Sequence, residues 1–219
     1  ITSSFNTTKG ACTYDLSPDD LNQIIGQPYL TSQHVEINKI QKVSKYRSAA
    51  GHNFVDYSGE SCVNLKHYFH TYAEGQITNT TQLPTSLNYY APANGTIITM
   101  SQTRTSVDPT DYEIDIKLTA NENVIVRLFH ITPKSGLSVG DQVTSGEQIG
   151  VAPTNHLDSG DFAVYVLTNQ GYRHLSMFEI MSPNVLQEFM NKGVNANWKQ
   201  DLYYEITNTY VSGIFCENG

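Results

Sequence analysis

Two side chains in the first third of the chain could carry metal chemistry. His52 and Asp56 lie four residues apart, near the start of a segment that is expected to be extended. This spacing can aim an imidazole and a carboxylate at one point. A hydrolytic zinc site needs three protein ligands and one open position, so the pair supplies two of the three. The alternative is a hydrogen-bonded His–Asp pair that stabilises a turn. A third ligand would decide between the two.

The segments that must position these residues are mostly strands. Residues 88–100 indicate a strand, a tight Asn94-Gly95 turn and a second strand. Glycines in 136–150 permit sharp turns between two very short strands. Alternating apolar residues predict strands over 33–47 and 112–118, and apolar runs predict further strands over 124–131 and 162–167.

Helices are expected only near the two ends. Ser17-Pro18 is a typical helix start, and Gly26 a typical end. Ser182-Pro183 opens a second helix, which Gly193 closes. We therefore expect a β domain over 31–180, with a tail and short helix (1–30) before it. A helix and an extended tail (181–219) follow it.

The bulk composition excludes several classes of function. The 219 residues are 39% hydrophobic and 16% charged, which is enough apolar material for a packed core. The net charge of −8 disfavours nucleic acid and anionic membranes, because both attract clustered Lys and Arg. No window approaches the ~20 apolar residues that span a bilayer. The chain begins at Ile1 without an apolar leader, which we interpret as a mature, processed form or as a trimmed one.

Cysteines and glycosylation signals fit an extracellular protein. One disulfide and one free cysteine are expected, and Cys12–Cys216 is the favoured pair because chain ends often lie close together. Cys62 could pair with either of them. Three triplets could accept N-linked glycans, at Asn6, Asn79 and Asn94.

Four segments, in order, resemble the M23 family of zinc metallopeptidases, the lysostaphin-like peptidoglycan endopeptidases. The pair His52 and Asp56 is similar to the first metal motif of that family. Residues 91–97 resemble its AP-x-x-G-x-V strand pair, 129–131 its x-His-Leu strand, and 139–150 its glycine hairpin. The resemblance covers 47–167. It implies a mainly β protein, with an antiparallel sandwich or barrel-like core and short helices near both ends.

The same resemblance implies a site with a defect. In the family, the third metal ligand is the second His of a His-x-His strand; here Asp161 and Ala163 occupy those two positions. Alanine has no donor atom. By position, His130 would assist catalysis, although a lone His on an apolar strand is often a core residue. Asp161 could replace a ligand, whereas His156, in a nearby loop, could do so only if the loop brought it in.

We therefore predict a secreted M23-like domain that is not a catalyst and needs no cofactor. Its partners would be a peptide, a glycan or other copies of the chain. One alternative is an active, zinc-dependent endopeptidase that uses His52, Asp56 and Asp161. Another is a glycosylated structural protein that assembles by strand addition through residues 1–13.

Overall fold

The protein is mainly antiparallel β-sheet in a computed structural model that describes residues 21, 23–44, 46, 65–71, 83–104, 108–168 and 171–194. The strands are β1 (Lys42–Val43), β2 (His67–His70), β3 (Asn88–Tyr90), β4 (Gly95–Arg104), β5 (Asp108–Leu118), β6 (Val124–Pro133), β7 (Gln142–Val143), β8 (Gln148–Val151), β9 (Ser159–Thr168) and β10 (Gly171–Leu175). The helices are the α-helix α2 (Pro183–Asn191) and the 3-10 turns η1 (Ile37–Lys39), η3 (Thr154–His156) and η4 (Met177–Glu179).

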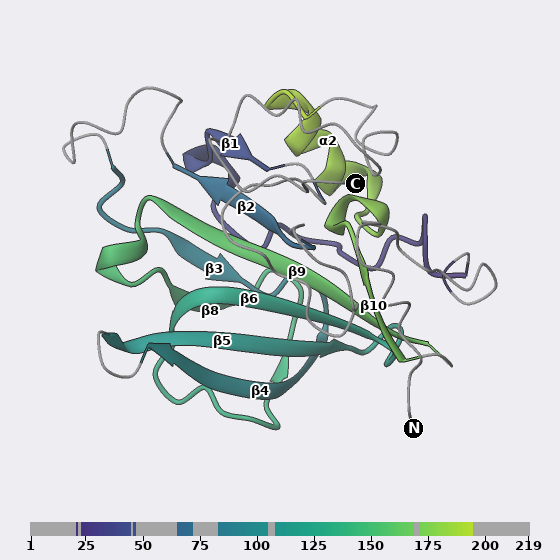
Figure 1. Cartoon of the computed structure of the whole chain (residues 1–219), viewed down its shortest axis with the longest axis horizontal. Helices are drawn as coiled ribbons and strands as arrows, with labels where there is room; N and C mark the ends of the chain where they lie inside the picture. The colour runs from purple at the N-terminus through teal and green to yellow at the C-terminus, as the bar shows by residue number, and fades with distance from the viewer. Residues whose placement is uncertain are drawn as a thin grey trace, which may run out of the picture.

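The described strands form one sheet with the order β1-β2-β9-β6-β5-β4-β7 (Figure 1). β10 pairs with β9, and β8 joins β3 to β6. The long strands β5, β6 and β9 lie side by side at its centre. The predicted antiparallel β fold is confirmed, and the sheet is open rather than closed into a barrel. This arrangement places the segment with Asp161 and Ala163 on a central strand, next to the strand that carries His130.

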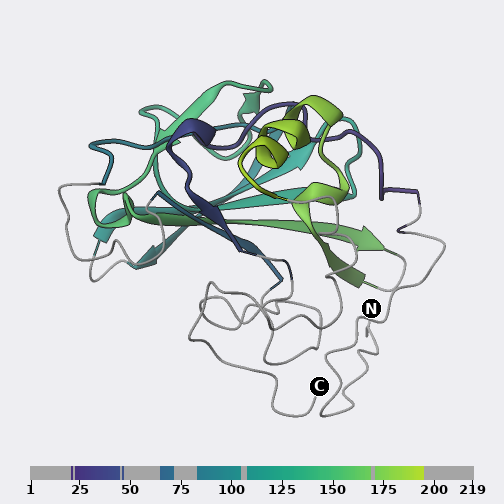
Figure 2. The ribbon, with the colours of Figure 1, turned by 90° about the horizontal axis from the view of Figure 1, so that it is seen from above.

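The two faces of the sheet have different characters. On β9, Phe162, Val164 and Val166 belong to the main apolar core, whereas Ala163 and Tyr165 belong to a smaller cluster. Alternate residues of a strand point to opposite faces, so the two clusters lie on opposite sides of the sheet. Helix α2 covers the main core face (Figure 2), where its Val185 and Phe189 are buried. The second face also carries the acidic and basic side chains that form the candidate site.

The strand predicted over 33–47 is wrong in most of its length. Among the described residues of this segment, only β1 is a strand, and η1 interrupts the segment upstream of it. Val35 and Ile40 are both buried, five residues apart. That spacing does not fit the period of two in a strand, and one turn of 3-10 helix brings both side chains to the core.

Residues 88–100 contain two strands, as predicted, but not a hairpin. β3 pairs with β8, whereas β4 pairs with β5 and β7. Gly95 lies within β4, where a Cβ would collide with Ile116 and with the backbone of Lys117. The glycine is thus required for close approach of β5, not for a tight turn.

The described residues agree with both ends of the second predicted helix, whereas the predicted start of the first, at Ser17-Pro18, lies outside them. Helix α2 starts at Pro183, and Gly193 follows it with φ 100°. Leu21 is helical, and Gly26 has φ 84°. Such left-handed backbone favours glycine after a helix. Among the described residues, no helix is long and apolar enough to cross a membrane.

Candidate functional site

A β-bulge on β6 determines the direction of the His130 side chain. The register changes between the pairs Ile114–Leu128 and Tyr112–Ile131. Two residues of β6, Phe129 and His130, therefore face the single residue 113 of β5. His130 has φ 56°, the only positive φ of a non-glycine residue in the described part of the chain. Bulges commonly redirect side chains beside functional sites, and this conformation costs free energy unless neighbours hold it.

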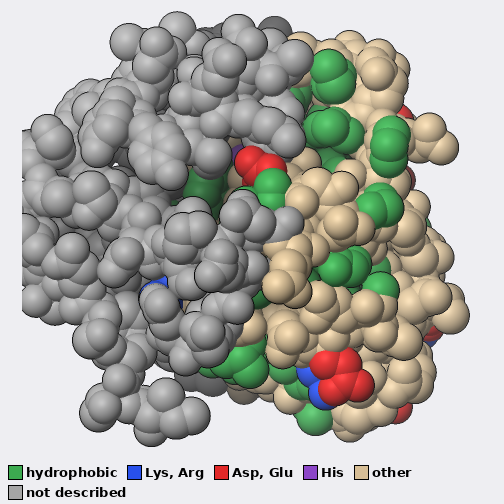
Figure 3. All heavy atoms as spheres, turned by 90° about the vertical axis from the view of Figure 1, so that its right-hand side faces the viewer, with side chains coloured by type: hydrophobic (Ala, Val, Ile, Leu, Met, Phe, Trp, Pro, Cys, Tyr) green, Lys and Arg blue, Asp and Glu red, His purple; other side chains and the backbone are tan. Residues whose placement is uncertain are grey.

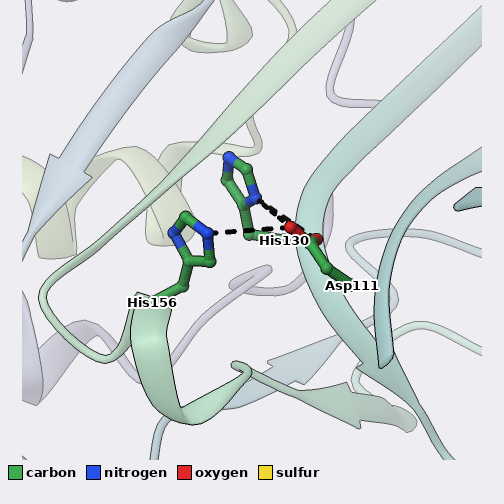
Figure 4. Close-up of side chains that lie close together, drawn as sticks. All are labelled: Asp111, His130 and His156. Atoms are coloured by element: carbon green, nitrogen blue, oxygen red, sulfur yellow. Dashed lines mark hydrogen bonds and ion pairs between the residues drawn. The ribbon is translucent and has the colours of Figure 1, made fainter. Parts of the chain in front are cut away.

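His130 meets Asp111 of β5 and His156 of η3 (Figure 4). Its Nδ1 lies 3.0 Å from Asp111 Oδ2 and 3.2 Å from Oδ1. His156 Nε2 lies 3.6 Å from the same Oδ2. The two imidazole rings are nearly parallel, with centroids 3.8 Å apart. Asp111 is fully buried, whereas the His130 and His156 side chains are 16% and 13% exposed. Two partly exposed imidazoles thus lie beside one buried carboxylate.

Asp161 lies on the other side of His130 and is paired with a lysine. Its Oδ1 is 3.8 Å from His130 Nε2, and its Oδ2 forms an ion pair with Lys66 Nζ. Both members of the ion pair are almost completely buried. The Lys66 ammonium also lies over the ring of Phe129, 4.3 Å from its centroid. The Asp161 carboxylate is therefore already neutralised by a protein cation.

The hydroxyl of Tyr89 lies in the main core, against Gly160 of β9. A Cβ at position 160 would overlap that hydroxyl, so Gly160 makes room for it. Burial, and then the charges of Asp161 and Asp111, raise the pKa of Tyr89 well above its ordinary value. The hydroxyl oxygen has no hydrogen-bond partner among the described residues. The phenol therefore stays protonated as a donor.

Ala163, where the M23 resemblance would expect a third metal ligand, has apolar surroundings and a cationic neighbour. Ala163 packs in the second cluster, with Tyr46, Leu65, Phe129 and Tyr165. Its cross-strand neighbour is Arg127, which donates to Asp115 at 2.6 and 2.8 Å. Burial lowers the pKa of Arg127, but the bonds to Asp115 outweigh that effect and raise the pKa overall. With Arg127 on one side and Lys66 near Asp161 on the other, these residues do not fit a zinc ion.

The structure brings together three of the residues singled out in the sequence, because the turn η3 places His156 against His130. His130 and Asp161 are neighbours, and Asp161 and Ala163 share one face, as expected. Asn94 is exposed, and its Oδ1 accepts a hydrogen bond from the Ser145 amide at 2.8 Å. The remaining site residues lie outside the described residues, namely His52, Asp56, Asn6, Asn79, Cys12, Cys62 and Cys216.

Sequence reasoning missed Asp111, which lies just before the strand predicted over 112–118. The observed β5 extends back to Asp108 and includes it. One signal was present in the sequence. Apolar residues recur at 124, 126 and 128 and then at 131, which is a slip of one residue. Such a slip indicates a bulge near His130, and a bulge indicates a redirected side chain.

Comparisons with known proteins found likeness in structure alone. No family model matches the chain, and no curated protein matches it. Among solved structures, lysostaphin has 16% identity over 63% of this chain, with a TM-score of 0.39. Csd3 of Helicobacter pylori has 13% identity over 79%, with a TM-score of 0.45. A putative glycyl-glycine endopeptidase LytM of Ruminococcus gnavus has 14% identity over 77%, with a TM-score of 0.44.

The matched regions span 49%, 42% and 62% of these three structures, respectively. The likeness to lysostaphin-like peptidases that the sequence motifs indicate is thus present among solved structures, as a likeness of fold. The face shown in Figure 3 has scattered apolar side chains and no broad patch of Lys and Arg on its described surface.

Proposed function

We propose that this chain is a non-catalytic M23-like domain that binds peptide or glycan outside the cell. The observation that carries the proposal is the environment of Ala163. Where the family requires a third metal ligand, this chain has a methyl group inside an apolar cluster, across the strand from Arg127. A side chain without a donor atom cannot complete a hydrolytic metal centre.

The Lys66–Asp161 ion pair weighs against an active enzyme that uses Asp161. A metal ion at Asp161 would have to displace the buried ammonium of Lys66 or lie beside it. At an effective dielectric constant of 20 and a separation of about 4 Å, like unit charges repel by roughly 4 kcal/mol, and a divalent ion doubles that. The pair therefore occupies the place that a substituted ligand set would need.

The class of ligand follows from the sequence motifs. Segments 91–97 and 139–150 resemble those of enzymes that act on peptidoglycan. A scaffold of that kind can keep a groove for a peptide or glycan after its metal centre is lost. We propose the same class of partner here, without turnover.

Incubation of the full chain with peptidoglycan and with Gly-rich peptides, in the presence of zinc, tests this proposal. The expected result is cosedimentation or peptide binding with intact ligands, unchanged by a chelator. Chelator-sensitive cleavage by the parent protein would overturn the non-catalytic assignment. Absence of binding to both ligands would overturn the assigned partner class.

A further inference from the structure

We propose that Asp111, His130 and His156 form a site for a divalent transition metal, distinct from the site that the M23 resemblance implies. The three ligand atoms all lie within 4.8 Å of one another. Metal–ligand bonds of about 2.0–2.2 Å place donors roughly 3–4 Å apart around one ion. The 3.0 and 3.6 Å separations from Asp111 Oδ2 have this size. Small movements of the two His side chains would shorten the remaining distance between ligand atoms to the same size.

The donor set selects the class of metal. Two imidazoles and one carboxylate suit zinc and first-row transition metals, whereas calcium and magnesium prefer oxygen ligands. The carboxylate is fully buried, and the two imidazoles are partly exposed. An ion held here would therefore have access from solvent on the imidazole side, where a fourth position would stay open.

His130 has an oriented second nitrogen, as metal-bound histidines generally do. Its Nδ1 faces Asp111, and its Nε2 faces Asp161 at 3.8 Å. A carboxylate on the far side of a ligating imidazole fixes the ring and raises its basicity. Asp161 is held in turn by Lys66. In this arrangement Asp161 is a positioning residue for the new site, not a ligand of the family's site.

Two independent features point to a ligand at this place. His130 keeps a left-handed backbone inside a strand, which costs free energy unless the surroundings maintain it. Tyr89, whose hydroxyl lies against Gly160 of β9, is fully buried and has no hydrogen-bond partner for that oxygen among the described residues. Strained residues cluster at functional sites, and a buried polar atom without a partner is rare in a folded protein.

The proposed site goes beyond the proposed function, because it requires neither cleavage nor the His52–Asp56 pair. It uses His130 in a different role from the one that the M23 resemblance implies. The two other members, Asp111 and His156, come from outside the motifs of that family.

Zinc titration of the full chain by calorimetry, with cobalt absorption spectra as a second readout, tests the site. We expect one equivalent of zinc per chain and a cobalt spectrum without thiolate bands. His156→Ala and Asp111→Asn should abolish both signals at metal concentrations that saturate the parent. Asn155→Ala is the matched control, since it changes an exposed neighbour in the same turn η3 and should bind as the parent does.

His52→Ala separates this site from the family's site. Retention of zinc in His52→Ala and its loss in His156→Ala are expected. Loss in His52→Ala with retention in His156→Ala would overturn the proposed site and would also contradict the non-catalytic assignment. Absence of zinc and cobalt binding in the parent would overturn the proposed site alone, because peptide or glycan binding is measured separately.

Discussion

Lys66 is the residue that most constrains what the polar face of the sheet can hold. Its side chain and that of Asp161 are 2% and 1% exposed. Burial of two charges costs several kcal/mol for each, and their attraction offsets this only while both are present. The pair therefore links the chemistry of the site to the stability of the fold.

Removal of one member of the pair should destabilise the protein strongly. Lys66→Met or Asp161→Leu alone should lower the free energy of unfolding by about 3–5 kcal/mol, because each leaves a buried charge without its partner. The double variant Lys66→Met/Asp161→Leu should recover most of that loss. Urea denaturation of the four proteins measures the coupling. Additive losses in the double variant would show that the two groups are not paired in solution.

At the scale of elements, β9 determines whether the metal site that the M23 resemblance implies could form. Its Ala163 packs in one cluster with Phe129 and Tyr165, and Arg127 is its cross-strand neighbour. A larger polar side chain here meets a packed apolar cluster and a cation. Both effects act against an imidazole at this position.

Ala163→His should therefore not create a peptidase. We expect a loss of about 1–3 kcal/mol in the free energy of unfolding from overpacking, and no zinc-dependent cleavage of Gly-rich peptides. Thermal denaturation and a peptide cleavage assay measure the two effects. If Ala163→His gained chelator-sensitive cleavage with unchanged stability, the apolar cluster and Arg127 would not exclude an imidazole at this position, and the parent would lack only the third ligand.

The same elements show what the sequence can and cannot predict. Alternation over 112–118 and apolar runs over 124–131 and 162–167 predicted three central strands, since a strand buried on one face alternates and a strand buried on both faces is apolar throughout. The ends of α2 followed from Pro183 and Gly193. The Asp111 cluster depends on which strands pair, and on a bulge that turns His130 toward β5. Such contacts between distant segments are set by tertiary packing, which spacing along the chain does not specify.

At the scale of the whole molecule, the main core includes an imidazole without a polar contact. His34 is 1% exposed and lies among Phe69, Phe162 and Phe189, with no hydrogen-bond partner for either ring nitrogen among the described residues. Burial, and to a smaller extent His67, lowers the pKa of His34 to about 3. Burial also lowers the pKa of His67 to about 4. Both groups are therefore neutral in the folded state at pH values where the unfolded chain protonates them.

Acid should consequently begin to destabilise the fold at a pH well above the pKa of the carboxylates. Below pH 6.5 the His34 side chain is protonated in the unfolded chain, whereas in the folded state it stays neutral down to about pH 3. The free energy of unfolding therefore decreases as the pH falls through this window. Each such group contributes a slope that approaches about 1.4 kcal/mol per pH unit below pH 6. His34→Phe fits the aromatic surroundings and should reduce the slope between pH 6 and pH 5 by about that amount. Urea denaturation at pH 7, 6 and 5 gives the slope of the free energy of unfolding against pH for the parent and for His34→Phe. Equal slopes in the two proteins would show that His34 is protonated in the folded state or is not buried in solution.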